Sequence, residues 1–125
     1  MARPNRVMGA PYSEKREPFM PNTAKIRELN DAFRTTLIGG RTVITPAIAA
    51  QPDLAQIVEL VKSYETFDLD NDPYAEHDFG AFRIGEQQVF WKIDYYDVDL
   101  QGGSPDPSDP AVTTRVLTIL RADEY

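Results

Sequence analysis

The chain has 125 residues, of which 42% are hydrophobic, so it is long and apolar enough for one globular domain with its own core. It has no cysteine, which excludes disulfides, thiolate catalysis and thiolate metal sites and is typical of a cytoplasmic protein. The net charge of −7 is unevenly divided, because residues 1–64 carry nine basic and six acidic residues (+3), whereas residues 65–125 carry four and fourteen (−10). The second half should therefore attract cations or basic protein surfaces and repel nucleic acid, so direct nucleic-acid binding is not expected.

The N-terminal region differs from the rest of the chain. Residues 1–21 contain four prolines and little periodicity, which predicts an extended arm that could wrap a second subunit to form a homodimer. Residues 22–125 are predicted to form a single domain. No apolar run approaches the roughly 20 residues of a membrane span, so we expect no insertion in a membrane.

Two helices and a short strand are predicted at the start of the domain. Asn22 or Thr23 can cap the first helix, and Gly39-Gly40 ends it. Residues 41–45 are rich in β-branched side chains and predict a strand, after which Pro52 and Asp53 begin the second helix. The apolar faces comprise Ile26, Leu29, Phe33 and Leu37 on the first helix and Leu54, Ile57, Val58, Val61 and Tyr64 on the second.

The second half of the domain is predicted to be mainly β. Residues 79–84 and 88–96 flank Gly85-Glu86, where the glycine suits the first position of a type II′ hairpin turn. Residues 113–120 predict a third antiparallel strand, with a helix beginning at Asp109-Pro110 as the alternative. On the strand 88–96 the expected core face is Val89, Trp91, Ile93 and Tyr95, and the mixed face is Phe90, Lys92, Asp94 and Tyr96. The fold class predicted is α+β, with two N-terminal helices packed on a three- to four-stranded antiparallel sheet.

The acidic segment before the hairpin partly matches a calcium-binding loop. Asp68, Asp70 and Asp72 copy the opening spacing of an EF-hand loop, in which alternate oxygens converge on one ion. The match then fails, because Pro73 replaces the required glycine and Phe79 replaces the bidentate glutamate. A local Asx-type turn, in which Asn71 and Asp72 bond to nearby backbone, is the better interpretation. No metal is therefore predicted here.

A catalytic alternative uses the only histidine. His77 with Glu76, Asp78, Asp94 and Asp97 could hold Mn²⁺ or Mg²⁺ and support a metal-dependent hydrolase or nuclease. Against this, three adjacent residues cannot all converge on one point, and a lone histidine beside carboxylates is more often a hydrogen-bonded structural residue. No phosphate-binding or dinucleotide-binding glycine motif is present, so no cofactor is expected.

A recognition surface is the leading interpretation of the same segment. Aromatic anchors among charged groups are a common composition of protein interfaces. The expected partner is a basic or nucleic-acid-binding protein surface, to which carboxylates could mimic phosphates. The predicted contact residues are Asp70, Asp72, Tyr74, Glu76, Asp78, Asp94, Tyr96, Asp97 and Asp99.

Several separated motifs resemble one uncharacterised bacterial family, the domain of unknown function DUF3768. They are Asn30-Asp31-Ala32-Phe33-Arg34, Asn71-Asp72-Pro73-Tyr74, Glu76-His77-Asp78-Phe79-Gly80, Trp91-Lys92-Ile93-Asp94-Tyr95-Tyr96-Asp97, Ser104-Pro105-Asp106-Pro107 and Arg115-Val116-Leu117-Thr118-Ile119. The similarity covers about residues 25–125, and the chain departs from it where the family typically has glycine, at Ala75 and Ala47.

The resemblance implies a genetic context and carries no catalytic residues. Such proteins tend to be encoded on plasmids, phages and integrative elements, near anti-restriction-like genes. We therefore expect an acidic protein-binding module of a mobile genetic element, an inhibitor or nucleic-acid mimic that acts on a host restriction or CRISPR complex. The metal-dependent hydrolase and a homo-oligomeric structural protein remain the alternatives.

Overall fold

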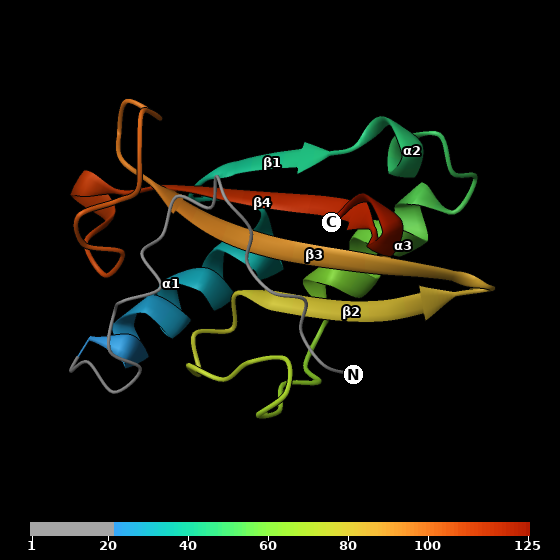
Figure 1. Ribbon diagram of the computed structural model, residues 1–125, viewed down its shortest axis with the longest axis horizontal. Helices are drawn as coiled ribbons and strands as arrows, with labels where there is room; N and C mark the ends of the chain where they lie inside the picture. Colours follow the sequence, from blue (N-terminus) through green and yellow to red (C-terminus); the bar gives the residue numbers. More distant parts are fainter. Residues whose placement is uncertain (1–21) are drawn as a thin grey trace.

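The computed structural model describes residues 22–125, and the predicted N-terminal arm lies outside them (Figure 1). The order is α1 (Thr23–Thr36), β1 (Arg41–Ile44), α2 (Pro46–Ala49), α3 (Leu54–Lys62), β2 (Phe79–Ile84), β3 (Gln87–Tyr96) and β4 (Thr114–Arg121). Two single turns of 3-10 helix, Pro110–Val112 and Ala122–Glu124, flank β4. The α+β class is confirmed, as are both predicted helices and all the predicted strands.

The sheet is mixed, so the prediction of a purely antiparallel sheet is wrong. Its strand order is β1-β4-β3-β2, and β1 pairs with β4 in parallel, with Arg41 opposite Val116. The β2–β3 and β3–β4 pairs are antiparallel. The chain leaves β1 through α2 and α3 and begins β2 at the opposite edge in the same direction as β1. Two reversals then bring β4 back parallel to β1.

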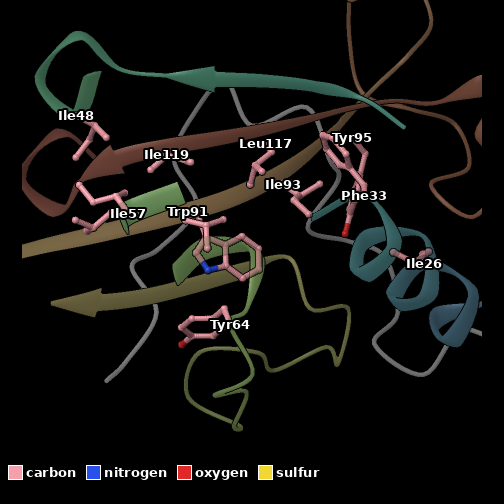
Figure 2. Close-up of a cluster of buried hydrophobic side chains, with 12 residues drawn as sticks. Ile26, Phe33, Ile48, Ile57, Tyr64, Trp91, Ile93, Tyr95, Leu117 and Ile119 are labelled. Carbon is pink, nitrogen blue, oxygen red and sulfur yellow. The ribbon is translucent and has the colours of Figure 1, made fainter. Parts of the chain in front are cut away.

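The core lies between the helices and one face of the sheet. Figure 1 shows α1 and α3 on the same side of the sheet, and Figure 2 shows the side chains that fill the space between these layers. The predicted core face of β3 is confirmed, because Val89, Trp91, Ile93 and Tyr95 are all fully buried. Their partners come from the helices, from β4 and, for Tyr64, from the segment that follows α3: Ile26, Phe33, Ile48, Ile57, Val61, Tyr64, Leu117 and Ile119.

The opposite face of the sheet carries a smaller apolar cluster. Phe90 packs edge-on against Phe79 at a centroid distance of 5.2 Å and against Tyr125 at 5.9 Å, and Leu120 completes the buried group. On this face Lys92 pairs with Asp94, whose side chain is 3% exposed. The predicted mixed face of β3 is therefore largely covered.

The ends of the helices differ in detail from the predictions. The left-handed residue that ends α1 is Leu37 (φ 60°), two positions before Gly39. Asn22 occupies the N-cap position without capping the helix through its side chain, which instead donates to Ser108 Oγ at 2.8 Å. The short helix α2 was not predicted, although Pro46 suits its first turn and Ile48 reaches the core.

The turns of the β half follow their sequence signals. Gly85 has φ +60°, and Ile84 pairs with Gln87, which makes the predicted two-residue hairpin loop. Asp109 accepts a hydrogen bond from the Ala111 backbone and caps a single 3-10 turn. The strand prediction for the C-terminal segment is confirmed, because the helix that was its alternative stops after that turn.

Candidate functional site

The segment between α3 and β2, residues 65–78, is here called the acidic loop. Side-chain bonds to its own backbone fix its course. Asp68 Oδ1 accepts from the backbone N–H groups of Asp70 (2.9 Å) and Asn71 (3.0 Å), and Asn71 Oδ1 accepts from Asp68 N–H (3.1 Å). Asp72 Oδ1 accepts from Glu76 and His77 N–H at 3.0 and 3.1 Å. The predicted Asx-type turn is confirmed, and these oxygens are directed at backbone donors.

His77 attaches the acidic loop to α1. Its Nδ1 lies 2.9 Å from Asp31 Oδ1, and its Nε2 lies 3.6 Å from Asp72 Oδ2. The imidazole also stacks on the Phe67 ring, with centroids 3.8 Å apart and planes 4° from parallel. The backbone is left-handed at His77 (φ 55°) and at Ala75 (φ 57°), one of the positions where the family typically has glycine. Each imidazole nitrogen faces a carboxylate and the ring stacks on Phe67, so His77 serves to hold the acidic loop in place.

A buried polar network joins the motifs of the family resemblance. Asn30 is its centre, because its Nδ2 donates to Tyr95 Oη (2.8 Å) and to the Glu76 carbonyl (3.0 Å), and its Oδ1 accepts from Arg115 Nε (2.7 Å). Tyr95 Oη donates to Glu76 Oε1 at 2.7 Å, and Arg115 also donates to the carbonyl of Pro107. The side chains of Asn30, Glu76, Tyr95 and Arg115 are at most 3% exposed. These contacts join α1, the acidic loop, β3, the 104–107 segment and β4.

The electrostatics of this network reflect its burial. Burial raises the pKa of Tyr95 well above its usual value, and the neighbouring carboxylates Asp78 and Glu76 raise it further. Burial also lowers the pKa of Arg115, which the charge of Glu76 partly opposes. The pKa of Asp72 is raised, first by burial and then by Asp78, against the hydrogen bond and charge of His77 and the hydrogen bond from Glu76 N–H. Burial therefore disfavours the ionised forms of Tyr95, Arg115 and Asp72 inside the domain.

Arg34 is a second buried cation, 3% exposed, between aromatic rings. Its guanidinium carbon lies 5.1 Å from the Trp91 ring centroid and 5.5 Å from that of Phe67. One nitrogen donates to the Tyr64 carbonyl at 3.1 Å and lies 3.5 Å from Asp31. This contact secures the end of α3 to α1, and burial lowers the pKa of the guanidinium.

The predicted contact and catalytic residues do not form one surface. Asp72, Glu76, Asp78 and Asp94 are only 1–6% exposed, and Asp94 lies on the opposite sheet face from Tyr95. Across residues 22–125, no group of three or more histidine and carboxylate side chains is placed to hold a metal ion. The structure therefore does not bring Glu76, His77, Asp78, Asp94 and Asp97 together as ligands.

The remaining predicted residues lie in two separate loops. Asp70 is exposed in the acidic loop, where Tyr74 is half-buried, whereas Asp97 and Asp99 follow β3. Figure 1 shows the acidic loop below β2 and the segment after β3 at the upper left. Asp97 accepts from the backbone of Asp99 and Gln101 at 3.1 and 2.9 Å, so it orders its own loop. Tyr96, at the end of β3, is half-buried.

Two features of the site were not predicted. Leu69 is 85% exposed between Asp68 and Asp70, and its only signal in the sequence is an apolar residue in an acidic stretch. Beside the acidic loop lies a hollow of about 410 Å³, here called the β2 groove. Its lining comes from three elements that no local pattern connects: Leu60, Ser63, Tyr64, Glu65, Thr66, Ala81 and Phe82.

Comparisons with known proteins identify the family of this chain. A search of curated proteins and a search of solved structures each found no match. In residues 22–125 no helix is long and apolar enough to cross a membrane. The family described as "Protein of unknown function (DUF3768)" matches residues 41–124, which is more than half of the chain. The matched range includes every motif of the buried network except that of α1, and the chain belongs to this family.

Proposed function

We propose that this protein is a non-catalytic, acidic binding module for a basic protein partner, and that the tip of the acidic loop makes the contact. The observation that carries the proposal is Leu69, a large aliphatic side chain 85% exposed between two aspartates. An apolar anchor surrounded by charge is the usual composition of an interface centre and its rim.

The rigidity of the tip supports the same proposal. The side chains of Asp68 and Asn71 each accept a hydrogen bond from the backbone N–H of the other residue, so the loop is ordered before any partner binds. A surface that is already ordered loses little conformational entropy on binding. Glu65 and Asp70, which precede and follow Leu69 in the chain, are exposed, so their carboxylates are available for basic groups.

The partner that best suits this surface is a protein that itself binds nucleic acid. Residues 65–125 carry a net charge of −10. Exposed carboxylates can pair with the basic side chains of a nucleic-acid-binding groove in the way that phosphates do. Together with the genetic context implied by the family resemblance, this leads us to propose an inhibitor or mimic encoded by a mobile element, acting on a host restriction or CRISPR complex.

The two alternatives have less support. A metal-dependent hydrolase requires converging ligands, and residues 22–125 contain no such group. A homo-oligomer assembled through the N-terminal arm concerns residues outside those described.

The test is a pull-down of the tagged full chain from bacterial lysate at low and high salt, with mass spectrometry of the retained proteins. We expect a nucleic-acid-binding complex that is released by salt and is lost when Leu69→Ser is combined with Asp70→Asn. The matched control combines Val98→Ser with Asp99→Asn, which makes the same chemical changes on the loop after β3, where Val98 is 58% exposed. Equal loss in both variants, or no retained partner, would count against the proposal.

A further inference from the structure

We infer that the outer edge of β2 and the groove beside it bind an extended, basic segment of the partner, which adds to the sheet as a further strand. This inference rests on the proposed protein-binding function and names the form of the partner. β2 stands at the end of the strand order, so within residues 22–125 only its inner edge is paired. An unpaired edge is a template for strand addition.

The pairing of the hairpin shows which backbone groups face outward. Ile84 and Gln87 close the two-residue loop, so Gly80, Phe82 and Ile84 bond inward to β3. The N–H and C=O groups of the alternate residues, Ala81 and Arg83, then point to the outer edge. The Ala81 N–H faces the Tyr64 hydroxyl and opposes the rise that burial causes in the pKa of that phenol. Within residues 22–125, the Ala81 carbonyl and both backbone groups of Arg83 remain for an added strand.

The β2 groove lies where the side chains of such a strand would arrive. Its volume of about 410 Å³ falls within the range of sites that accept a ligand or a peptide side chain. Leu60 of α3 and Phe82 of β2 supply apolar walls, and Phe82 shares the sheet face of its partner Val89. A strand alternates its side chains between faces, so every second residue of the segment would meet this groove.

The walls of the groove are ordered without a ligand. The Tyr64 ring packs edge-on against Phe67 and Trp91, with centroids 5.2 and 5.6 Å away. This packing needs the absence of a side chain at Gly80, where a Cβ would lie 2.2 Å from Trp91 Nε1 and 2.8 Å from the Tyr64 ring. The Arg34 contact to the Tyr64 carbonyl holds the backbone at the same point. Binding therefore requires little rearrangement of the site.

Charge selects the chemistry of the segment. Glu65 lines the groove and is exposed, and Asp68 and Asp70 continue the negative surface toward the tip of the acidic loop. An occupant with an aliphatic side chain in the groove would have Glu65 as the partner for a Lys or Arg beside that side chain, with Asp70 exposed further along the acidic loop. The groove and the tip are then two parts of one interface.

The test uses the full chain and a library of short random peptides displayed on phage, selected at low salt. We expect enriched peptides that combine an aliphatic residue with Lys or Arg in an extended pattern. Their affinity should fall at least tenfold in Arg83→Pro, which removes an outward N–H and leaves the inward ladder intact. It should fall equally in Ser63→Trp, which fills the groove, and stay unchanged in Gln56→Trp, an exposed α3 position outside the groove.

The outcomes separate this inference from the proposed function. Failure to enrich any peptide, or enriched peptides that bind Ser63→Trp as tightly as the parent, would overturn the inference. If a partner from lysate requires Leu69 and Asp70 but still binds Ser63→Trp, the proposed function stands and the groove is not its site. Displacement of that partner by an enriched peptide supports both.

Discussion

At the scale of single residues, Ala75 holds a backbone conformation that suits glycine better. Its φ of 57° is left-handed, it is exposed, and its carbonyl accepts a hydrogen bond from Arg27 at 2.9 Å. A side chain at such a φ destabilises the folded state by roughly 1 to 2 kcal/mol. Glycine removes this strain, but the greater conformational entropy of its unfolded chain offsets part of the gain in stability.

We predict that Ala75→Gly raises the free energy of unfolding by about 0.5 to 1 kcal/mol in a denaturant titration. The control is Ala32→Gly at an exposed position inside α1, where glycine should destabilise by about 1 kcal/mol. If both variants lose stability alike, the left-handed turn at Ala75 is not strained.

Asp72 makes a residue-scale prediction for pH. Burial, followed by the charge of Asp78, raises its pKa in the folded state, so ionisation there opposes folding. The folded chain binds this proton more readily than the unfolded chain, and stability therefore rises as pH falls through the raised folded pKa toward the unfolded value. Asp72→Asn keeps an oxygen for the Glu76 and His77 N–H groups and removes the charge.

We therefore expect the stability of Asp72→Asn relative to the parent chain to be greatest at neutral pH and to shrink as the solution is acidified toward pH ~4. Denaturant titrations at several pH values measure it. Asp70→Asn, an exposed change in the same loop, should show no such trend. A constant difference across pH would mean that Asp72 carries no shifted proton.

At the scale of elements, Arg115 joins β4 to α1 and to the 104–107 segment. It is 3% exposed, and its loss would leave Asn30 Oδ1 and the Pro107 carbonyl buried without a donor. We predict that Arg115→Met lowers the free energy of unfolding by about 3 kcal/mol, the usual cost of breaking a buried charged network. Arg27→Met, which removes a hydrogen bond made at the surface, should cost less than about 1 kcal/mol, and equal losses would contradict the network.

The elements themselves were largely predictable, because their signals are local. The apolar stripe that includes Ile26 and Phe33 predicted α1, and Gly85 predicted the hairpin turn. The parallel pairing of β1 with β4 was not predictable, since Arg41 and Val116 are distant in sequence and the crossover direction decides how they meet.

The candidate site was predicted less well than the fold, for a physical reason. Charged residues are usually at the surface, so the sequence alone placed Asp72, Glu76 and Asp78 on a binding face. They are buried, and for Glu76 the reason lies in partners that come from far away in the chain, such as Tyr95. The motifs did locate a special region, but its exposed part comprises Leu69 and the β2 groove, which have almost no local signature.

At the scale of the whole molecule, the charge distribution should act on folding and binding with opposite signs. The net charge of −7 makes the folded chain repel itself, and salt screens this repulsion over about 8 Å at physiological ionic strength. We predict that the thermal unfolding midpoint rises by a few degrees between low salt and about 150 mM NaCl. The same salt should weaken binding to a basic partner, because attraction across that interface is screened as well.

Exposed carboxylates would account for the salt dependence of both the unfolding midpoint and partner binding. A variant that lacks some of them is therefore the control. Neutralising Asp70 and Asp99 as Asn and Glu86 as Gln leaves the buried network and the Arg121–Asp123 pair untouched, since all three side chains are exposed. The variant should start with a higher midpoint at low salt and respond less to added NaCl. A midpoint that falls with salt in the parent chain would instead mean that surface pairs such as Arg121–Asp123 and Lys62–Glu59 outweigh the net repulsion. Attraction to a partner would then depend on the local carboxylates around Leu69 and not on the overall field. In that case the variant that combines Leu69→Ser with Asp70→Asn would lose binding. The triple variant with Asp70 restored would still bind the partner.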